Sequence, residues 1–180
     1  MTSSEMPHVS IRPATPDDIP AITRVYAHAV MHGTASFEFE PPDEREMARR
    51  MNELTGKDFP YFAADSGGAL AGYAYAALYR TRPAYRFTVE DSVYIAPDSH
   101  RRGVGRALLA ALIEACEARG FRQMIAVIGD SPRQQASVGL HAALGFRHVG
   151  ILQDVGFKHG RWVDTLLMQR ELGEGGRTGP

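Results

Sequence analysis

The segment Val93–Leu109 (VYIAPDSHRRGVGRALL) holds the clearest combination of residues that could do chemistry. Its apolar start predicts a β-strand, and its end predicts a helix entered through a Gly-x-Gly turn. Glycines at a helix entrance let backbone N–H groups approach a ligand, because no Cβ stands in the way. The first-turn amides lack partners inside the helix, and the helix dipole favours an anion beside them. Three arginines, Arg101, Arg102 and Arg106, add positive charge, so the segment predicts a pyrophosphate site.

Two common phosphate-binding motifs do not fit this segment. A P-loop requires Lys and then Ser or Thr after its last glycine, whereas Gly105 is followed by Arg106 and Ala107. A dinucleotide-binding fingerprint requires a third glycine, and Leu108 stands at that position. The two glycines by themselves are also compatible with a helix that simply begins at a flexible turn.

The basic cluster is conspicuous because the whole chain is nearly neutral, with 20 Lys and Arg against 21 Asp and Glu. A length of 180 residues with 44% hydrophobic side chains predicts one globular domain, over residues 1–172, and the Gly-rich residues 173–180 predict a disordered tail. Nothing in the bulk charge indicates a nucleic-acid or membrane partner. The single cysteine, Cys116, permits no disulfide within the chain and favours a reducing cytoplasm, and we interpret it as a buried apolar side chain. Residues 1–8 lack the apolar stretch of a signal peptide.

Hydrophobic periodicity and turn residues predict an α/β fold with the element order β-α-α-β-β-β-α-β-α-β-β. The strands before and after the helix that follows Gly103 should be parallel neighbours, because a helical crossover joins them. We expect strands over Val9–Arg12, Tyr61–Ala64, Ala69–Tyr79, Phe87–Ala96, Met124–Ile128, Phe146–Leu152 and Val163–Arg170. We expect helices opened by Asp17 and Asp18, and over Asp43–Leu54, Gly103–Arg119 and Gln134–Leu144.

The segment from Val93 to Leu108 resembles the acetyl-CoA motif of the GCN5-related N-acetyltransferases, the GNAT family. The motif positions are Val93-Tyr94-Ile95, His100-Arg101-Arg102-Gly103-Val104-Gly105 and Leu108, with His100 where the family usually has Gln or Arg. The resemblance covers about residues 9–172 and narrows to the branch that acetylates phosphinothricin and methionine sulfone. The segments that carry it are Thr88–Tyr94, Ala126–Ser131, Ser137–His141, Leu144–Phe146 and, most unusual, Val155–Asp164.

The resemblance implies a fold and a cosubstrate. The fold is a mixed, mostly antiparallel sheet of about seven strands, flanked by about four helices and splayed between strands 4 and 5. The cosubstrate is acetyl-CoA, and the enzyme is a cytoplasmic homodimer that acts on a small-molecule amine. The cofactor-binding residues that it implies are Val93, Tyr94, Ile95, Arg101, Arg102, Gly103, Val104, Gly105, Arg106, Gln134 and Ser137, with Gln134 where the family often has Asn.

Two residues are implied as catalytic. An amine arrives as an ammonium ion and must lose a proton before it attacks a thioester, and Glu90 is the general base by resemblance. The alternative for Glu90 is a strand-edge carboxylate in a structural hydrogen bond. His141 stands where many relatives have a Tyr that assists the leaving sulfur. A structural role for a helix histidine is the open alternative there.

The acceptor pocket is implied by a second set of residues. Arg80, Thr81 and Arg82 belong to a loop that lines this pocket in the family, and a guanidinium pairs well with a carboxylate or phosphinate. Phe37 and Lys158 are assigned to the same pocket. The implied reaction is direct N-acetylation of an amino-acid-like substrate. The alternatives are acetylation of a protein N-terminus or another amine, and a non-catalytic acyl-CoA sensor. The histidines show no paired spacing of metal ligands, so we expect no metal site.

Overall fold

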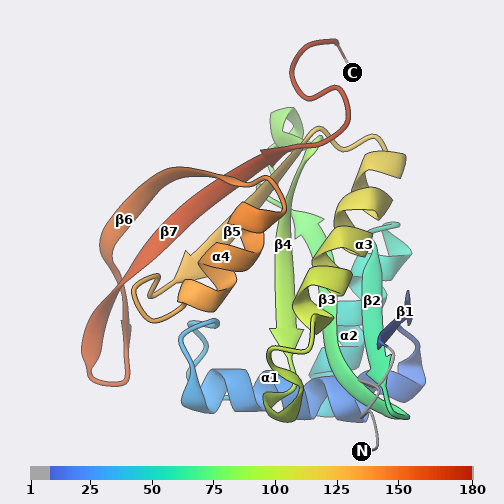
Figure 1. The fold of residues 1–180 in the computed structure, drawn as a ribbon, viewed down its shortest axis with the longest axis vertical. Coiled ribbons are helices and arrows are strands. Elements are labelled where there is room, and N and C mark those ends of the chain that lie inside the picture. Colours follow the sequence, from blue (N-terminus) through green and yellow to red (C-terminus); the bar gives the residue numbers. More distant parts are fainter. Residues whose placement is uncertain (1–8, 180) are drawn as a thin grey trace, which may run out of the picture.

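A computed structural model describes residues 9–179, in which seven strands form one sheet (Figure 1). Their order across the sheet is β1-β2-β3-β4-β5-β7-β6, and every neighbouring pair is antiparallel except β4 and β5. The strands are β1 Val9–Pro13, β2 Tyr61–Ser66, β3 Ala69–Leu78, β4 Thr88–Ile95, β5 Gln123–Gly129, β6 Arg147–Lys158 and β7 Arg161–Glu171.

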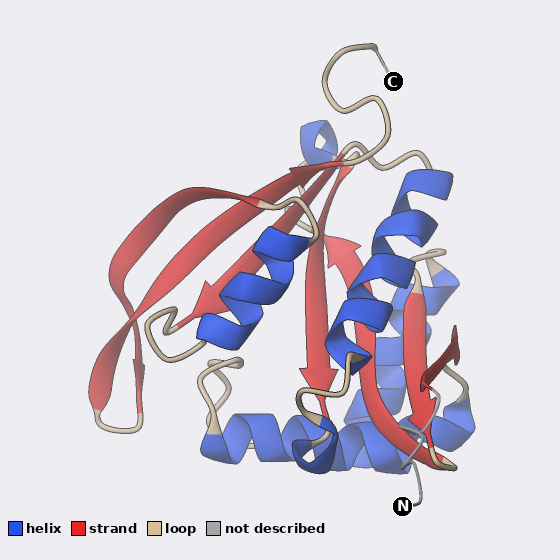
Figure 2. Ribbon diagram, in the orientation of Figure 1, coloured by secondary structure: helices blue, strands red, loops and turns tan. Residues whose placement is uncertain are grey.

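Four α-helices cover the two faces of this sheet (Figure 2). They are α1 Ile19–His32 and α2 Glu44–Gly56 on one face, and α3 Val104–Ala118 and α4 Gln135–Ala143 on the other. Each face has its own core, because each helix buries one apolar stripe against the sheet. The stripe of α3 includes Leu108, Leu109 and Leu112, which are fully buried.

Strands β4 and β5 pair only at their beginnings. The parallel ladder joins Thr88, Val89 and Glu90 to Gln123, Met124 and Ile125. Beyond these residues β4 continues to Ile95 and β5 to Gly129, but the two strands diverge (Figure 1). The predicted seven-stranded mixed sheet, its four helices, the parallel neighbours and the splay are therefore confirmed.

The hairpin of β6 and β7 corrects one expectation. The sequence predicted a strand that ends at Leu152 and another that begins at Val163, with a long loop between them. In the structure the strands continue to a tight turn at His159 and Gly160, both of which have positive φ. Lys158 and Trp162 therefore lie on strands. The prediction failed because β6 is an exposed edge strand with an irregular register, so no alternation of apolar and polar residues marks it.

The ends of the chain limit two further expectations. The predicted absence of a signal peptide concerns residues 1–8, which lie outside the described residues. The predicted disorder of residues 173–180 stays a prediction; Leu172 is fully buried, and the segment after it turns back so that Arg122 hydrogen-bonds to Thr178 Oγ1 at 3.1 Å. Within residues 9–179, every helix is too short or too polar to cross a membrane.

Truncation of Leu109 to Ala tests the core that carries α3. We expect a loss of about 2–5 kcal/mol in the free energy of unfolding, because a fully buried leucine leaves a cavity. Urea unfolding measures the loss, and Glu114→Ala, at an exposed position of the same helix, is the matched control. Equal stability of the two variants would contradict the packing described for α3.

Candidate active site

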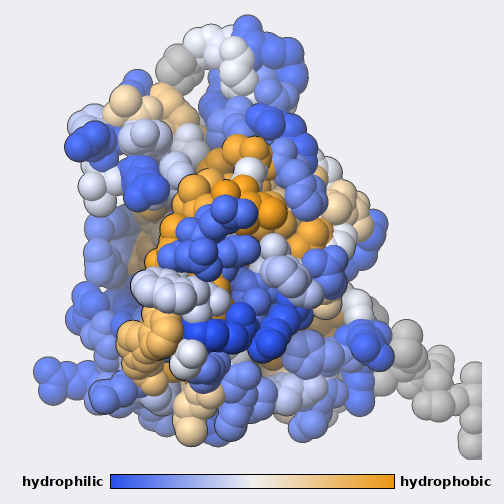
Figure 3. All heavy atoms as spheres, turned by 90° about the vertical axis from the view of Figure 1, so that its left-hand side faces the viewer, coloured by the Kyte–Doolittle hydropathy of each residue, from blue (hydrophilic) through white to orange (hydrophobic). Residues whose placement is uncertain are grey.

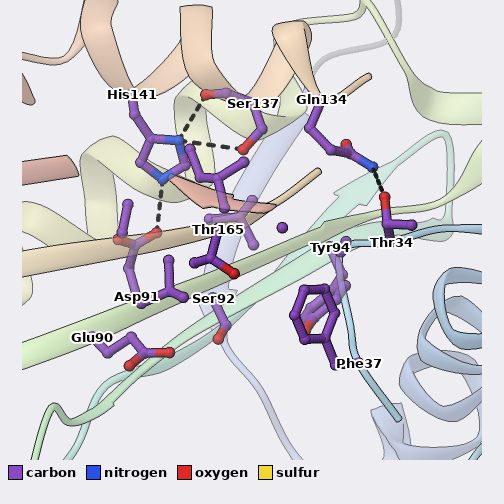
Figure 4. Close-up of a pocket in the computed structure, with 16 residues that line it drawn as sticks. Thr34, Phe37, Glu90, Asp91, Ser92, Tyr94, Gln134, Ser137, His141 and Thr165 are labelled. Carbon is purple, nitrogen blue, oxygen red and sulfur yellow. Dashed lines mark hydrogen bonds and ion pairs between the residues drawn. The ribbon is translucent and has the colours of Figure 1, made fainter. Parts of the chain in front are cut away.

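A pocket of about 200 Å³ opens where β4 and β5 diverge (Figure 4). It is bounded by the two separating strands, by α4, and by the loop between α1 and α2, here called the 33–43 loop. The lining residues are Thr34, Ala35, Phe37, Glu90, Asp91, Ser92, Val93, Tyr94, Ala126, Val127, Ile128, Gly129, Gln134, Ser137, His141 and Thr165.

The pleat of β4 turns alternate side chains of the pocket toward opposite faces of the sheet. Tyr94 packs into the core beneath α1 and α2, which places Glu90 and Ser92 on the same side. Val93 packs into the core beneath α3, and Asp91 bonds to a residue of α4. The pocket therefore reaches both faces of the sheet through the gap between β4 and β5.

Glu90 lies in the pocket wall and is the last residue of β4 that pairs with β5. Burial raises the pKa of its carboxyl group above the usual value, the negative charge of Asp91 raises it further, and the charge of Arg80 acts in the opposite direction. No hydrogen bond from a residue in the described part of the chain contributes to this shift. A half-buried carboxyl group with a raised pKa suits general-base work near neutral pH.

Asp91 and His141 form a buried pair across the gap between β4 and α4 (Figure 4). Their side chains are 2% and 5% exposed, and Asp91 Oδ2 lies 2.9 Å from His141 Nε2. His141 Nδ1 lies 2.7 Å from the carbonyl oxygen of Ser137. A carbonyl oxygen and an ionised carboxylate oxygen can only accept, so while Asp91 is ionised this geometry suits a ring that donates from both nitrogens, the imidazolium form.

The charge state of His141 results from two opposing effects. Burial lowers the pKa of the ring, but the hydrogen bond and charge of Asp91, with the hydrogen bond to Ser137, raise it and prevail. The ring also meets the edge of Phe146, with 4.9 Å between centroids. The second carboxylate oxygen of Asp91, Oδ1, is buried and has no hydrogen-bond partner within residues 9–179. Asp91 was not among the predicted site residues, since its only signal was its position beside Glu90 on a strand.

The entrance to α3 has the geometry that the Gly-x-Gly turn predicted. Gly103 has a φ of 78°, which favours glycine, and a Cβ there would meet nothing within 4 Å. Glycine at position 105 is explained by close packing instead, because a Cβ there would lie 3.2 Å from Leu140 of α4. The first backbone bond of the helix runs from Ala107 N–H to the Gly103 carbonyl, so the amides of residues 104–106 are those of an open helix N-terminus.

The three predicted arginines surround this open helix end. Arg101, Arg102 and Arg106 are exposed, and none forms an ion pair in the part of the chain that is described. Free amides and unpaired guanidinium groups on one loop suit a polyanionic ligand such as a pyrophosphate. Of the other predicted cofactor residues, Val93, Tyr94, Gln134 and Ser137 line the pocket, and Ile95, which packs in the core beside α3, does not.

The predicted acceptor residues occupy three different places. Phe37 lines the pocket. Arg80, Thr81 and Arg82 lie on the exposed loop after β3, where Arg80 stacks on Tyr79 at 4.9 Å from its ring centroid. Lys158 is buried at the end of β6, and its ammonium donates to the Ser36 carbonyl of the 33–43 loop. Burial lowers the pKa of Lys158, and the charge of Glu38 acts against that shift.

A further network that sequence reasoning missed is centred on Asp130, at the end of β5. This buried carboxylate pairs with Arg161 of β7 and accepts a hydrogen bond from Thr34 Oγ1 at 3.2 Å. Gln134 Nε2 donates to the same hydroxyl at 3.3 Å. Asp130 thereby joins the 33–43 loop to the β6–β7 hairpin at the pocket mouth, although these residues lie far apart in the sequence.

Comparison with known proteins places the chain among acetyltransferases. The family described as "Acetyltransferase (GNAT) domain" matches residues 11–167. The chain belongs to the GNAT family. The prediction of an acetyl-CoA-dependent N-acetyltransferase of this family is confirmed.

Individual relatives are similar over nearly the whole chain. A phosphinothricin N-acetyltransferase of Alcaligenes faecalis is 56% identical over 171 residues, which are 95% of this chain and 86% of the relative. An L-methionine sulfoximine/L-methionine sulfone acetyltransferase of Salmonella typhimurium is 36% identical, covering 92% and 96% of the two chains. The crystal structure of a phosphinothricin acetyltransferase from Sinorhizobium meliloti in complex with AcCoA superposes with a TM-score of 0.92 at 50% identity, covering 96% of this GNAT chain and 92% of that one.

Replacement of Asp91 by Asn tests the buried imidazolium. The variant removes the negative charge, so we expect the pKa of His141 to fall below its usual value of about 6.5. Imidazole ¹H–¹⁵N spectra recorded across a pH series measure that pKa. An Asp98→Asn variant, on an exposed turn, is the control, and an unchanged pKa in Asp91→Asn would contradict the pair.

Proposed function

We propose that this GNAT enzyme transfers the acetyl group of acetyl-CoA to the amino group of a small amino-acid-like substrate. Substrates of the phosphinothricin, methionine sulfone and methionine sulfoximine type are the proposed acceptors, because relatives that are 56% and 36% identical carry those names. The observation that carries the proposal is the carboxyl group of Glu90, half-buried in the wall of a pocket that reaches both faces of the sheet. One ligand can enter from each face of the sheet, so that the two ligands meet beside Glu90.

The residues at the α3 entrance fit the pyrophosphate end of acetyl-CoA. The open amides of residues 104–106 and the arginines around them provide donors and positive charge. Gly103 leaves space beside the backbone for a phosphate group. When bound, acetyl-CoA supplies an activated acetyl thioester, and Val93, Tyr94, Gln134 and Ser137 are the proposed pocket contacts for its other end.

Glu90 is the proposed general base and β4 the proposed oxyanion donor. The Glu90 carboxylate accepts a proton from the acceptor ammonium and leaves a neutral amine that can attack. The edge of β4 that faces β5 has no strand partner after Glu90, so its amide groups there, around Val93–Ile95, can donate to the carbonyl oxygen of the reacting group. These donors are fixed by the sheet before the reaction, which limits the reorganisation that catalysis requires.

His141 is proposed to supply the proton that the departing sulfur takes up. Free thiols titrate near ~8.5, so a group that keeps its proton at neutral pH is a suitable donor. The raised pKa of His141 favours that condition, and the ring lines the pocket. Both ring nitrogens are engaged in the structure, so proton donation to the sulfur requires Nδ1 to release the Ser137 carbonyl oxygen. Asp91 holds the ring in place and fixes its charge state.

The acceptor is proposed to lie against Phe37, with its acidic group toward Arg80, Thr81 and Arg82. A guanidinium binds a carboxylate or phosphinate through two parallel hydrogen bonds. Lys158 is proposed to act through the 33–43 loop, because its ammonium already binds the Ser36 carbonyl. A site that binds an acidic group favours an amino-acid acceptor over a protein N-terminus.

A homodimer formed in the cytoplasm is proposed for the assembled enzyme. The β6 strand and the start of β7 expose six large apolar side chains, and Figure 3 views the molecule from that side. They are Val149, Ile151, Leu152, Val155, Phe157 and Trp162. An exposed apolar patch of this kind is typical of a protein interface.

Removal of Glu90's carboxylate tests the chemical step. Glu90→Gln should lower kcat by about 10²–10⁴-fold with phosphinothricin or methionine sulfone, measured as free thiol released from acetyl-CoA. In the wild type, kcat/KM should fall as pH drops through the raised pKa of Glu90, above the usual value of about 4.3. Glu114→Gln, at an exposed position on α3, is the control. Full activity of Glu90→Gln would remove Glu90 from the base role. If the wild type binds acetyl-CoA but turns over no amine, the alternative of a non-catalytic acyl-CoA sensor is favoured.

The proposed dimer is tested by a charge on the apolar patch. Ile151→Asp should shift the sedimentation coefficient from a dimer to a monomer, because a buried unpaired carboxylate is unfavourable at an interface. Gln153→Asp, a neighbouring exposed position without an apolar side chain, is the comparison. A wild-type chain that sediments as a monomer would overturn the dimer.

A further inference from the structure

The ring of Phe37 rests on the backbone of two glycines, one at the end of β5 and one in β6. A Cβ built on Gly129 of β5 would lie 2.6 Å from Cε1 of this ring. A Cβ built on Gly156 of β6 would lie within 3.0 Å of three ring atoms, Cε2, Cδ2 and Cζ. Real Cβ atoms are essentially never this close to another atom. Any side chain at position 156 would therefore displace the ring.

The residues on both sides of Phe37 are held in place, so a displaced ring must turn about its own side-chain bonds, because the loop cannot shift with it. Tyr26 of α1 bonds to Ser36 Oγ at 3.0 Å and donates to Glu38 Oε1 at 2.9 Å. Arg50 of α2 also binds Glu38, at 2.7 Å. Lys158 holds the carbonyl of Ser36 from the end of β6. The residues before and after Phe37 are thereby held by α1, α2 and β6.

Backbone conformation does not explain the glycine at position 156. Its φ lies outside the left-handed region, so an L-residue could adopt the same backbone there. The same strand offers a direct comparison in Gly150, where a Cβ would meet nothing within 4 Å. The space that Gly156 leaves is used by the Phe37 ring.

We propose that Gly156 is a positioning residue for the acceptor. Because Gly156 has no side chain, the Phe37 ring can pack against its backbone, and this contact fixes the acceptor wall of the pocket. The inference rests on the proposed function, which assigns Phe37 to that wall. The ring is 39% exposed and lines the pocket, so a side chain at position 156 pushes it toward the space where the acceptor binds. The site at the α3 entrance lies on the other side of the sheet and is not affected.

The KM values of the Gly156→Ala variant, measured with phosphinothricin and with methionine sulfone, test the packing of the Phe37 ring on Gly156. The added methyl group must move the ring before its atoms reach the 3.4 Å of an ordinary contact. We expect the acceptor KM to rise about tenfold, as for an overpacked site, while the KM for acetyl-CoA stays unchanged. Gly150→Ala on the same strand should leave both values unchanged. Thermal unfolding and sedimentation of both variants check that the fold and the oligomeric state are retained.

A double-mutant cycle with Phe37→Ala separates the packing of the Phe37 ring on Gly156 from a general effect of the substitution on β6. Gly156→Ala should add no further change to the acceptor KM when Phe37 is already Ala, because the clashing ring is absent. The proposal is overturned if the acceptor KM of Gly156→Ala equals that of Gly150→Ala. It is also overturned if Gly156→Ala raises the acceptor KM by the same factor with Phe37 and with Ala at position 37. Absence of turnover by the wild type with every acceptor overturns the proposed function instead, and the acceptor role of Gly156 with it.

Discussion

The separation of β4 from β5 is the constraint on which the rest of this molecule depends. Parallel pairing ends at Glu90, and from there each strand leaves one row of backbone groups without a ladder partner. Unpaired backbone groups must be satisfied by another partner, so the sheet can stay open only where a ligand or water can reach it. The packing of α3 against the sheet supports the opening, with Gly105 allowing α4 to approach. The opening places amide donors, Glu90 and His141 around one space.

Local sequence patterns predicted those parts of the site that lie on single elements. The apolar residues of β4 and the Gly-x-Gly turn before α3 placed the strand, the open helix end and its arginines correctly, because each depends on neighbours within a few residues. The partner of His141 was not predicted, since Asp91 lies fifty positions earlier and contacts it only through the packing of α4 on β4. Exposed edge strand β6 lacked the alternation that marks a half-buried strand, and its extent was therefore missed.

The β6–β7 hairpin organises the acceptor side through contacts that no sequence pattern reveals. Lys158 binds the 33–43 loop, Arg161 binds Asp130, and Gly156 receives the ring of Phe37. The contacts of Lys158 and Gly156 with the 33–43 loop join segments more than a hundred residues apart. The side chains proposed to bind the cosubstrate and those proposed to shape the acceptor end thus belong to different supersecondary units. Changes in β6 and β7 can alter the acceptor wall while the entrance to α3 stays intact.

Two adjacent carboxyl groups of β4 acquire different roles from the faces that they occupy. Glu90 and Asp91 are neighbours, and the charge of Asp91 raises the pKa of Glu90. The imidazolium of His141 offsets that charge, because it pairs with Asp91 at 2.9 Å. The folded pKa of His141 is raised, so the stability that the pair contributes is fully present below about pH 6.5 and is lost as pH rises through the folded value. A proton on His141 therefore keeps the charge of Asp91 compensated beside the carboxyl group of Glu90, the proposed base.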